Sequence, residues 1–186
     1  MISIRYAIAA DAKILLTIRR AAVLSCGNEH YSPEQLMAWA PIVNEATIKT
    51  EAEALNNRDR VTIIAVIDGS ELDYSLNLAN DTLSVEKTAQ RSVTSKIVGL
   101  CTIGLSEALL KQCYVLPQYR GMGIAKGLVR TVESIAQSEG ISSLKLSSSL
   151  IALNFYEKLG YRAIERYHYD LEGGLVMECV MMYKNI

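Results

Sequence analysis

The sequence predicts a mixed α/β fold, with a mostly antiparallel central sheet of about seven strands and helices on both of its faces. The order of the segments is the first reason, because strand-like and helix-like stretches alternate from one end of the chain to the other. Composition is the second reason. Of the 186 residues, 50% are hydrophobic and 21% are charged, as in a globular protein with a substantial core. We therefore expect a single domain over 1–186, with an insertion at 70–95.

The first segments predict a strand followed by a helix. Residues 2–8 alternate between apolar and polar side chains, which is typical of a strand. Asp11 is the expected N-cap of the helix that follows, and Gly27 is expected just beyond its end. The buried face of this helix is expected to carry four apolar residues, namely Ile14, Leu15, Ile18 and Ala22.

Two further helices are expected before the next strand. Ser32 and Gln35 have the spacing of a capping box, and Pro33 between them suits the first position of a helix. Pro41 closes this helix, and residues 45–56 indicate another short one.

Strands are expected next at 60–69, 96–104 and 109–117, the first of them ending in a turn at Asp68 and Gly69. The insertion at 70–95 lies between the first two of these strands and is longer than most loops in compact domains. Its apolar residues alternate on both sides of Asn80 and Asp81, which predicts a hairpin formed by Leu76, Leu78, Leu83 and Val85. A mobile polar insertion is the alternative.

The last third predicts a helix, a strand, a short helix and two closing strands. The helix at 123–138 has one apolar stripe and stops at Gly140, and the strand covers 142–149. The short helix at 150–160 ends in Gly160. Glu172, Gly173 and Gly174 are expected to form the turn of the closing hairpin.

Charge and cysteine content exclude several classes of function. With 19 basic and 20 acidic residues the net charge is −1, so we expect no nucleic-acid partner and no membrane partner. The four cysteines lie far apart and no histidine stands at metal-ligand spacing, which predicts small buried hydrophobic residues rather than a metal site. The N-terminus resembles neither a signal peptide nor a membrane span, which predicts a cytoplasmic protein.

The stretch VLPQYRGMGIAKGL, residues 115–128, has the properties of a phosphate cradle. Helix N-termini present unpaired backbone N–H groups, and glycines leave these groups accessible to an anion. The stretch does not match a Walker loop, because Lys126 precedes Gly127. It also lacks the third glycine of a dinucleotide fingerprint, since Lys126 occupies that position. A tight turn with exposed basic residues remains the alternative.

Taken with its flanks, the stretch YVLPQYRGMGIAKGLV is similar to the acetyl-CoA signature of the GNAT superfamily of N-acetyltransferases, through Arg120, Gly123 and Ala125. The downstream segment IALNFYEKLGY at 151–161 resembles a second motif of that family, and the likeness is clear over roughly 97–162. The resemblance implies acetyl-CoA as acyl donor, no metal, and a splay between the fourth and fifth strands, 109–117 and 142–149.

The resemblance also implies which residues hold the donor. Its pyrophosphate would lie beside Arg120, on backbone amides of the loop and the first helical turn. These amides belong to Gly121, Met122, Gly123, Ile124, Ala125 and Lys126. The pantetheine arm would pair with the strand at Cys113, Tyr114 and Val115, and an N–H near Val115 would polarise the thioester. Ser149 stands where many members of the family carry an asparagine, and its hydroxyl is shorter.

Two catalytic roles follow from the chemistry. An alkylamine with a pKa of roughly 10 must lose a proton before it attacks. Glu107 is the first candidate for the base, although a solvated turn residue is the alternative, and Glu29 and His30 come next. The resemblance implies that Tyr156 protonates the departing thiolate; the alternative is a tyrosine that packs its ring under the helix.

The expected function is therefore transfer of an acetyl group from acetyl-CoA to a primary amine of a small molecule or a protein, by direct attack. A non-catalytic acyl-CoA-binding module is one alternative, and a nucleotide-binding regulatory domain is another. A homodimer could form through the apolar final strand at 175–183, but the same residues could also be interior.

Overall fold

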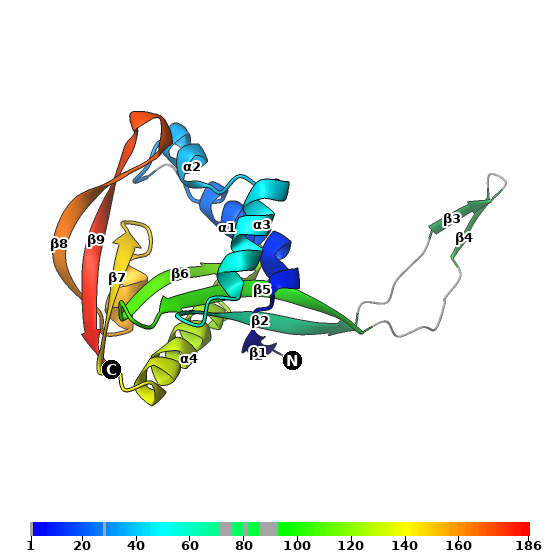
Figure 1. Ribbon diagram of the computed structural model, residues 1–186. Helices are drawn as coiled ribbons and strands as arrows, with labels where there is room; N and C mark the ends of the chain where they lie inside the picture. Colours follow the sequence, from blue (N-terminus) through cyan, green and yellow to red (C-terminus); the bar gives the residue numbers. More distant parts are fainter. Residues whose placement is uncertain (1, 28, 71–75, 80–81, 86–92) are drawn as a thin grey trace.

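A computed structural model describes residues 2–27, 29–70, 76–79, 82–85 and 93–186. It confirms the predicted class (Figure 1). The seven strands of the main sheet have the order β1-β2-β5-β6-β7-β9-β8, and all neighbours are antiparallel except β6 and β7. The strands are β1 (Ile2–Tyr6), β2 (Arg60–Ser70), β5 (Val93–Gly104), β6 (Leu109–Val115), β7 (Ser143–Ser149), β8 (Arg162–Asp170) and β9 (Val176–Asn185).

Helices cover both faces of this sheet, and each face has its own core. Figure 1 shows α1 (Ala12–Leu24), α2 (Pro33–Trp39) and α3 (Glu45–Leu55) on one side, and α4 (Ile124–Ser138) on the other. The short helix α5 (Leu153–Lys158) contributes Tyr156 to the same core as α4. Leu128 and Val132 of α4 are fully buried in that core, while Ile18 of α1 is fully buried in the core of the opposite face.

The predicted capping box of α2 is present. The hydroxyl of Ser32 accepts a hydrogen bond from the backbone N–H of Gln35, and the Gln35 side chain accepts one from the Ser32 N–H at 2.7 Å. Pro33 occupies the first turn, and the helix ends at Trp39, before Pro41. Local chemistry alone therefore determines where this helix begins and ends.

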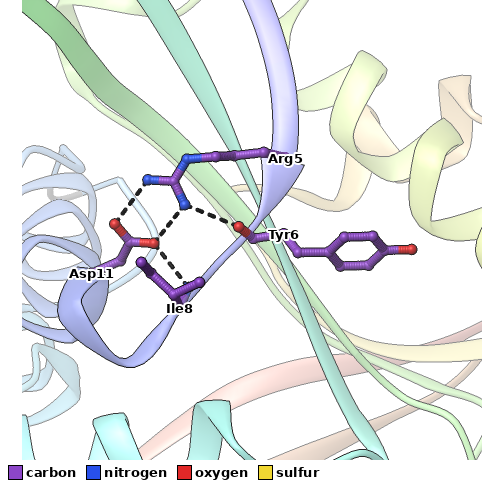
Figure 2. A network of polar contacts seen from close by, with 4 residues as sticks. All are labelled: Arg5, Tyr6, Ile8 and Asp11. Carbon is purple, nitrogen blue, oxygen red and sulfur yellow. Dashed lines mark hydrogen bonds and ion pairs between the residues drawn. The ribbon is translucent and has the colours of Figure 1, made fainter.

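Asp11 is the N-cap residue of α1, as predicted, but its side chain makes no capping hydrogen bond. Its carboxylate instead accepts two hydrogen bonds from the Arg5 guanidinium, at 2.7 and 2.9 Å, and one from the Ile8 N–H at 2.9 Å (Figure 2). The hydrogen bonds from Arg5 hold the pKa of Asp11 below its usual range. Ile14 is also more exposed than expected, at 37%, because the buried stripe of α1 is centred on Leu15 and Leu16.

The predicted turn at Asp68 and Gly69 is wrong, because β2 continues to Ser70. Asp68 pairs with Ser95 and Gly69 with Thr94, so the ladder between β2 and β5 extends beyond the expected end. In the insertion, β3 (Leu76–Ala79) and β4 (Thr82–Val85) form a separate antiparallel pair in the register Leu76 to Val85. Asn80 and Asp81 lie outside the described residues.

The last strand, β9, lies between β7 and β8, so its backbone is paired on both sides. Its buried side chains are Met177, Cys179, Val180 and Met182. The apolar final strand is therefore interior and does not offer a free edge to a second copy. Within the described residues, no helix has the length and apolar character needed to span a bilayer.

Candidate functional site

The sheet opens between β6 and β7. These strands pair in parallel only through Leu109 with Lys145 and Leu110 with Leu146. On its other side, β6 has a bulge at this level, because Thr102 of β5 pairs with Gln112 while Ile103 pairs with Leu110, which leaves Lys111 unpaired. A bulge bends its strand and increases the local twist. It thus gives a physical reason for β6 to turn away from β7, and the predicted splay is confirmed.

A cleft of about 820 Å³ occupies the splay. Its walls come from six parts of the chain: α1 and the turn after it, α2, β6, the loop before α4 with the first turn of α4, the end of β7, and α5. The donor half, as we define it, consists of the glycine loop, the first turn of α4, and α5. The acceptor half faces α1 and α2 and is lined by Ala22, Val23, Cys26, Trp39 and Tyr114.

The N-terminus of α4 opens into the donor half. Gly121 and Gly123 both have φ of +77°, in the left-handed region that favours glycine, and a Cβ at either position would meet no protein atom within 4 Å. Gly123 is the N-cap of α4, and the first intrahelical bond runs from the Gly127 N–H to its carbonyl at 3.0 Å. The amides of residues 124–126 therefore precede the ladder and have no helical acceptor.

Arg120 fixes the glycine loop to the opposite face of the sheet. One of its guanidinium nitrogens donates to the carbonyl of Ala22 and to the hydroxyl of Ser25, both at 2.8 Å. Cations at a helix C-terminus are favourably placed, because the carbonyls there carry partial negative charge. Arg120 thus lines the cleft and also joins the last turn of α1 to the cradle. Met122, by contrast, is 56% exposed and does not line the cleft.

The residues expected around the thioester lie together. Cys113, Tyr114 and Val115 of β6 line the cleft with Ser149 at the end of β7 and Tyr156 of α5. The ring of Tyr156 is 6% exposed and makes edge contacts with Phe155 and Tyr161, at centroid distances of 5.0 and 5.7 Å. Burial raises the pKa of the Tyr156 hydroxyl well above its ordinary value, so this group remains protonated at neutral pH.

The three candidates for a general base lie elsewhere. Glu107 is in the turn between β5 and β6, with a half-exposed side chain whose carboxylate pairs with Lys111 at 2.8 Å. Glu29 and His30, between α1 and α2, are exposed. None of the three lines the cleft, and the described residues that do line it include no carboxylate or imidazole. Glu107 as base stays a prediction.

Trp39 and Tyr114 form an aromatic wall in the acceptor half, whereas the sequence left open whether Trp39 lines a cleft or is ordinary packing. Trp39 contacts both Tyr31 and Tyr114, at centroid distances of 6.2 and 6.4 Å. The Tyr31 hydroxyl donates to the carbonyl of Glu178 and accepts from the Leu150 N–H, and burial raises its pKa to about 12. These bonds tie the start of α2 to β9 and to the β7–α5 loop, so the wall depends on contacts between segments more than 100 residues apart.

The cysteines also differ from expectation in part. Cys101 and Cys179 are buried, as predicted, whereas Cys26 and Cys113 are half-buried and line the cleft. Lys158 of α5 lines the cleft too. The only sequence signal for Lys158 is its position two residues after Tyr156 on the same short helix.

Comparison with known proteins finds acetyltransferases that resemble this chain. The family model described as an acetyltransferase (GNAT) domain matches residues 88–163. Glucosamine 6-phosphate N-acetyltransferase of Trypanosoma brucei brucei is 29% identical over 134 residues, which cover 67% of this chain and 89% of the relative. The residues matched by the family model include β6, α4, β7 and α5, which all contribute to the cleft.

Solved structures share the fold. A GCN5-related N-acetyltransferase from Rhodopseudomonas palustris has a TM-score of 0.74 at 22% identity, over 99% of this chain and 95% of the other. The PaiA N-acetyltransferase of Thermoplasma acidophilum, determined in complex with coenzyme A, has a TM-score of 0.65 at 20% identity, over 100% of this chain and 99% of the other.

Proposed function

The chain belongs to the GNAT family of acetyltransferases, and from this premise we propose that it transfers an acetyl group from acetyl-CoA to a primary amine of a small molecule or a protein. The observation that supports the proposal most is the open cradle at the N-terminus of α4. Two left-handed glycines leave free space there, in front of amides without helical acceptors. A diphosphate is the kind of anion that such a terminus binds.

In this proposal the donor half holds acetyl-CoA, which supplies an activated acetyl thioester. The amides of residues 123–126 would receive the pyrophosphate, and Lys126 and Lys158 would add positive charge beside it. The edge of β6 at Cys113 to Val115, left without a partner by the splay, would receive the pantetheine arm as an added strand. The Val115 N–H would donate to the thioester oxygen and stabilise the charge that develops there.

The chemical step breaks the bond between the acyl carbon and sulfur and forms a bond between the acyl carbon and nitrogen. The amine enters from the acceptor half, and the sulfur leaves with the electron pair of the broken bond. Tyr156 would donate the proton that converts the departing thiolate to a thiol, because its buried hydroxyl is protonated at neutral pH and lines the cleft. The attacking nitrogen loses one proton as the amide forms, and this proton would return to the Tyr156 oxygen directly or through water. We do not assign the proton of the amine to Glu107, since Lys111 holds that carboxylate outside the cleft lining.

Two measurements test the proposal. Calorimetry should show binding of acetyl-CoA and CoA in preference to NAD and ATP, and a panel of amines incubated with acetyl-CoA should include at least one that releases free thiol. Binding of acetyl-CoA without thiol release from any amine would indicate a non-catalytic acyl-CoA-binding module. Preferential binding of NAD or ATP would indicate a nucleotide-binding regulatory domain.

A further inference from the structure

The acceptor half of the cleft offers little to hold a positively charged amine. Its lining consists of two aliphatic side chains, one thiol and two aromatic rings, contributed by Ala22, Val23, Cys26, Trp39 and Tyr114. A surface of this kind removes water from an amine without replacing the lost hydrogen bonds. Desolvation disfavours the charged form of a titratable group, so an ammonium ion is destabilised here relative to the neutral amine.

The charged groups around the cleft also destabilise an ammonium ion relative to the neutral amine. Four cationic side chains line it, namely Lys111, Arg120, Lys126 and Lys158. Arg19 adds a fifth cation behind the wall, with its guanidinium carbon 5.9 Å from the centre of the Tyr114 ring. Of the carboxylates packed nearby, Glu107 is paired with Lys111, and Glu178 is paired with Arg166 at 2.8 Å. Glu34 of α2 and Glu29 before it are exposed and do not line the cleft, so among the described residues an ammonium ion in the acceptor half meets no carboxylate in the cleft lining.

The remaining titratable groups of the cleft are arranged as donors. Burial raises the pKa values of Tyr114 and Tyr156, so both hydroxyls keep their protons at neutral pH, and Tyr119 is a third phenol. The Cys26 thiol lies 3.3 Å from the carbonyl of Ala22, and the Cys113 thiol lies 4.0 Å from another backbone carbonyl, so each donates its hydrogen. None of these groups is set to take the proton of an incoming ammonium ion before the acetyl transfer begins.

We propose that the acceptor is a weakly basic amine, such as the α-amino group of a peptide or an amino sugar, which gives its proton to water and enters the cleft already neutral. This inference rests on the proposed acetyl transfer and narrows its substrate class. Strongly basic amines, such as lysine side chains and polyamines, are then poor acceptors because so little of each is neutral. At pH 7.5 an α-amino group is about one quarter neutral and a lysine about 0.1%, roughly a 200-fold difference.

A peptide with a free α-amino group and one lysine places both amines in the same molecule. The full chain is incubated with this peptide and acetyl-CoA at pH 7.5, and mass spectrometry of fragments locates the acetyl group. We expect the α-amino product to exceed the ε-amino product by about 100-fold or more, given the ordinary basicity of the two groups. Comparable yields of both products, or an excess of the ε-amino product, would overturn the inference.

The pH dependence of kcat/KM provides a second and independent readout. A phenylalkylamine and its difluorinated analogue have nearly the same shape, but fluorine lowers the basicity of the amine. If the acceptor deprotonates in solution, kcat/KM levels off at a pH set by the pKa of the acceptor amine. This pH is then lower for the fluorinated compound. A plateau at one fixed pH for both compounds would reveal a protein base and overturn the inference. Failure of the proposed function is distinguishable, because it gives no thiol release with any acceptor.

Discussion

Replacing Gly123 by alanine tests the cradle directly, because the structure separates its effect on folding from its effect on the donor. The added methyl group would meet no protein atom within 4 Å, so it causes no clash inside the chain. The backbone at position 123, however, has φ of +77°, where an L-residue is strained by about 1–2 kcal/mol relative to glycine. For a chain of this size, the strain should lower Tm by about 2–8 °C.

The effect on the donor should be larger than the effect on folding. The methyl group would occupy the space in front of the α4 amides that we assign to the pyrophosphate. Losing one hydrogen bond to a charged group costs about 1.5–3 kcal/mol. The Kd for acetyl-CoA should therefore rise roughly 10- to 150-fold, measured by calorimetry at a temperature well below the reduced Tm.

Gly140, just after the end of α4, provides a matched control. Its φ is +79°, and a Cβ there would also meet no atom within 4 Å, but it lies at the opposite end of the helix and does not line the cleft. Gly140→Ala should lower Tm by a similar amount and leave the Kd unchanged. If Gly123→Ala binds acetyl-CoA like the parent, or if both variants weaken binding equally, the assignment of the cradle is wrong.

Three other substitutions have expected outcomes. Tyr156→Phe should lower kcat at least 10-fold and leave the Kd for acetyl-CoA nearly unchanged; parental turnover in a thiol-release assay would place the acid elsewhere. Glu107→Gln should change kcat/KM by less than about threefold and stability by less than about 1 kcal/mol, since its ion pair with Lys111 is half-exposed; a large loss of activity would identify Glu107 as the base. Asp11→Asn should lower the free energy of unfolding by about 1–3 kcal/mol at pH 7. Because Arg5 lowers the pKa of Asp11 in the folded state, its contribution is complete above the ordinary value of 3.8 and is lost as the pH falls through the folded-state value. Chemical denaturation at pH 7 and pH 3 should therefore show a smaller difference between parent and variant at pH 3, and a constant difference would contradict the ion pair of Figure 2.

Short-range patterns in the sequence predicted most helix boundaries. The capping box at Ser32 and Gln35 and the glycine at position 140 involve atoms within a few residues of one another, so the sequence contains all the information needed. Asp11 occupies the predicted N-cap position, but its carboxylate binds Arg5 and the Ile8 N–H instead of capping α1. A side-chain cap of α1 is a local option, but Arg5 of β1 comes within 2.7 Å only after the strand joins the sheet.

The sequence by itself determined the class of fold, the glycine loop before α4 and the resemblance to GNAT acetyltransferases, because each depends on contiguous residues with a fixed local geometry. Only the tertiary structure decided where the cleft opens and what lines its acceptor half. The bulge at Lys111 arises from the register between β5 and β6, and the wall formed by Trp39 and Tyr114 requires α2 to pack against β6. The contact between Trp39 and Tyr114 joins residues more than 70 positions apart, and no local pattern specifies its distance or burial.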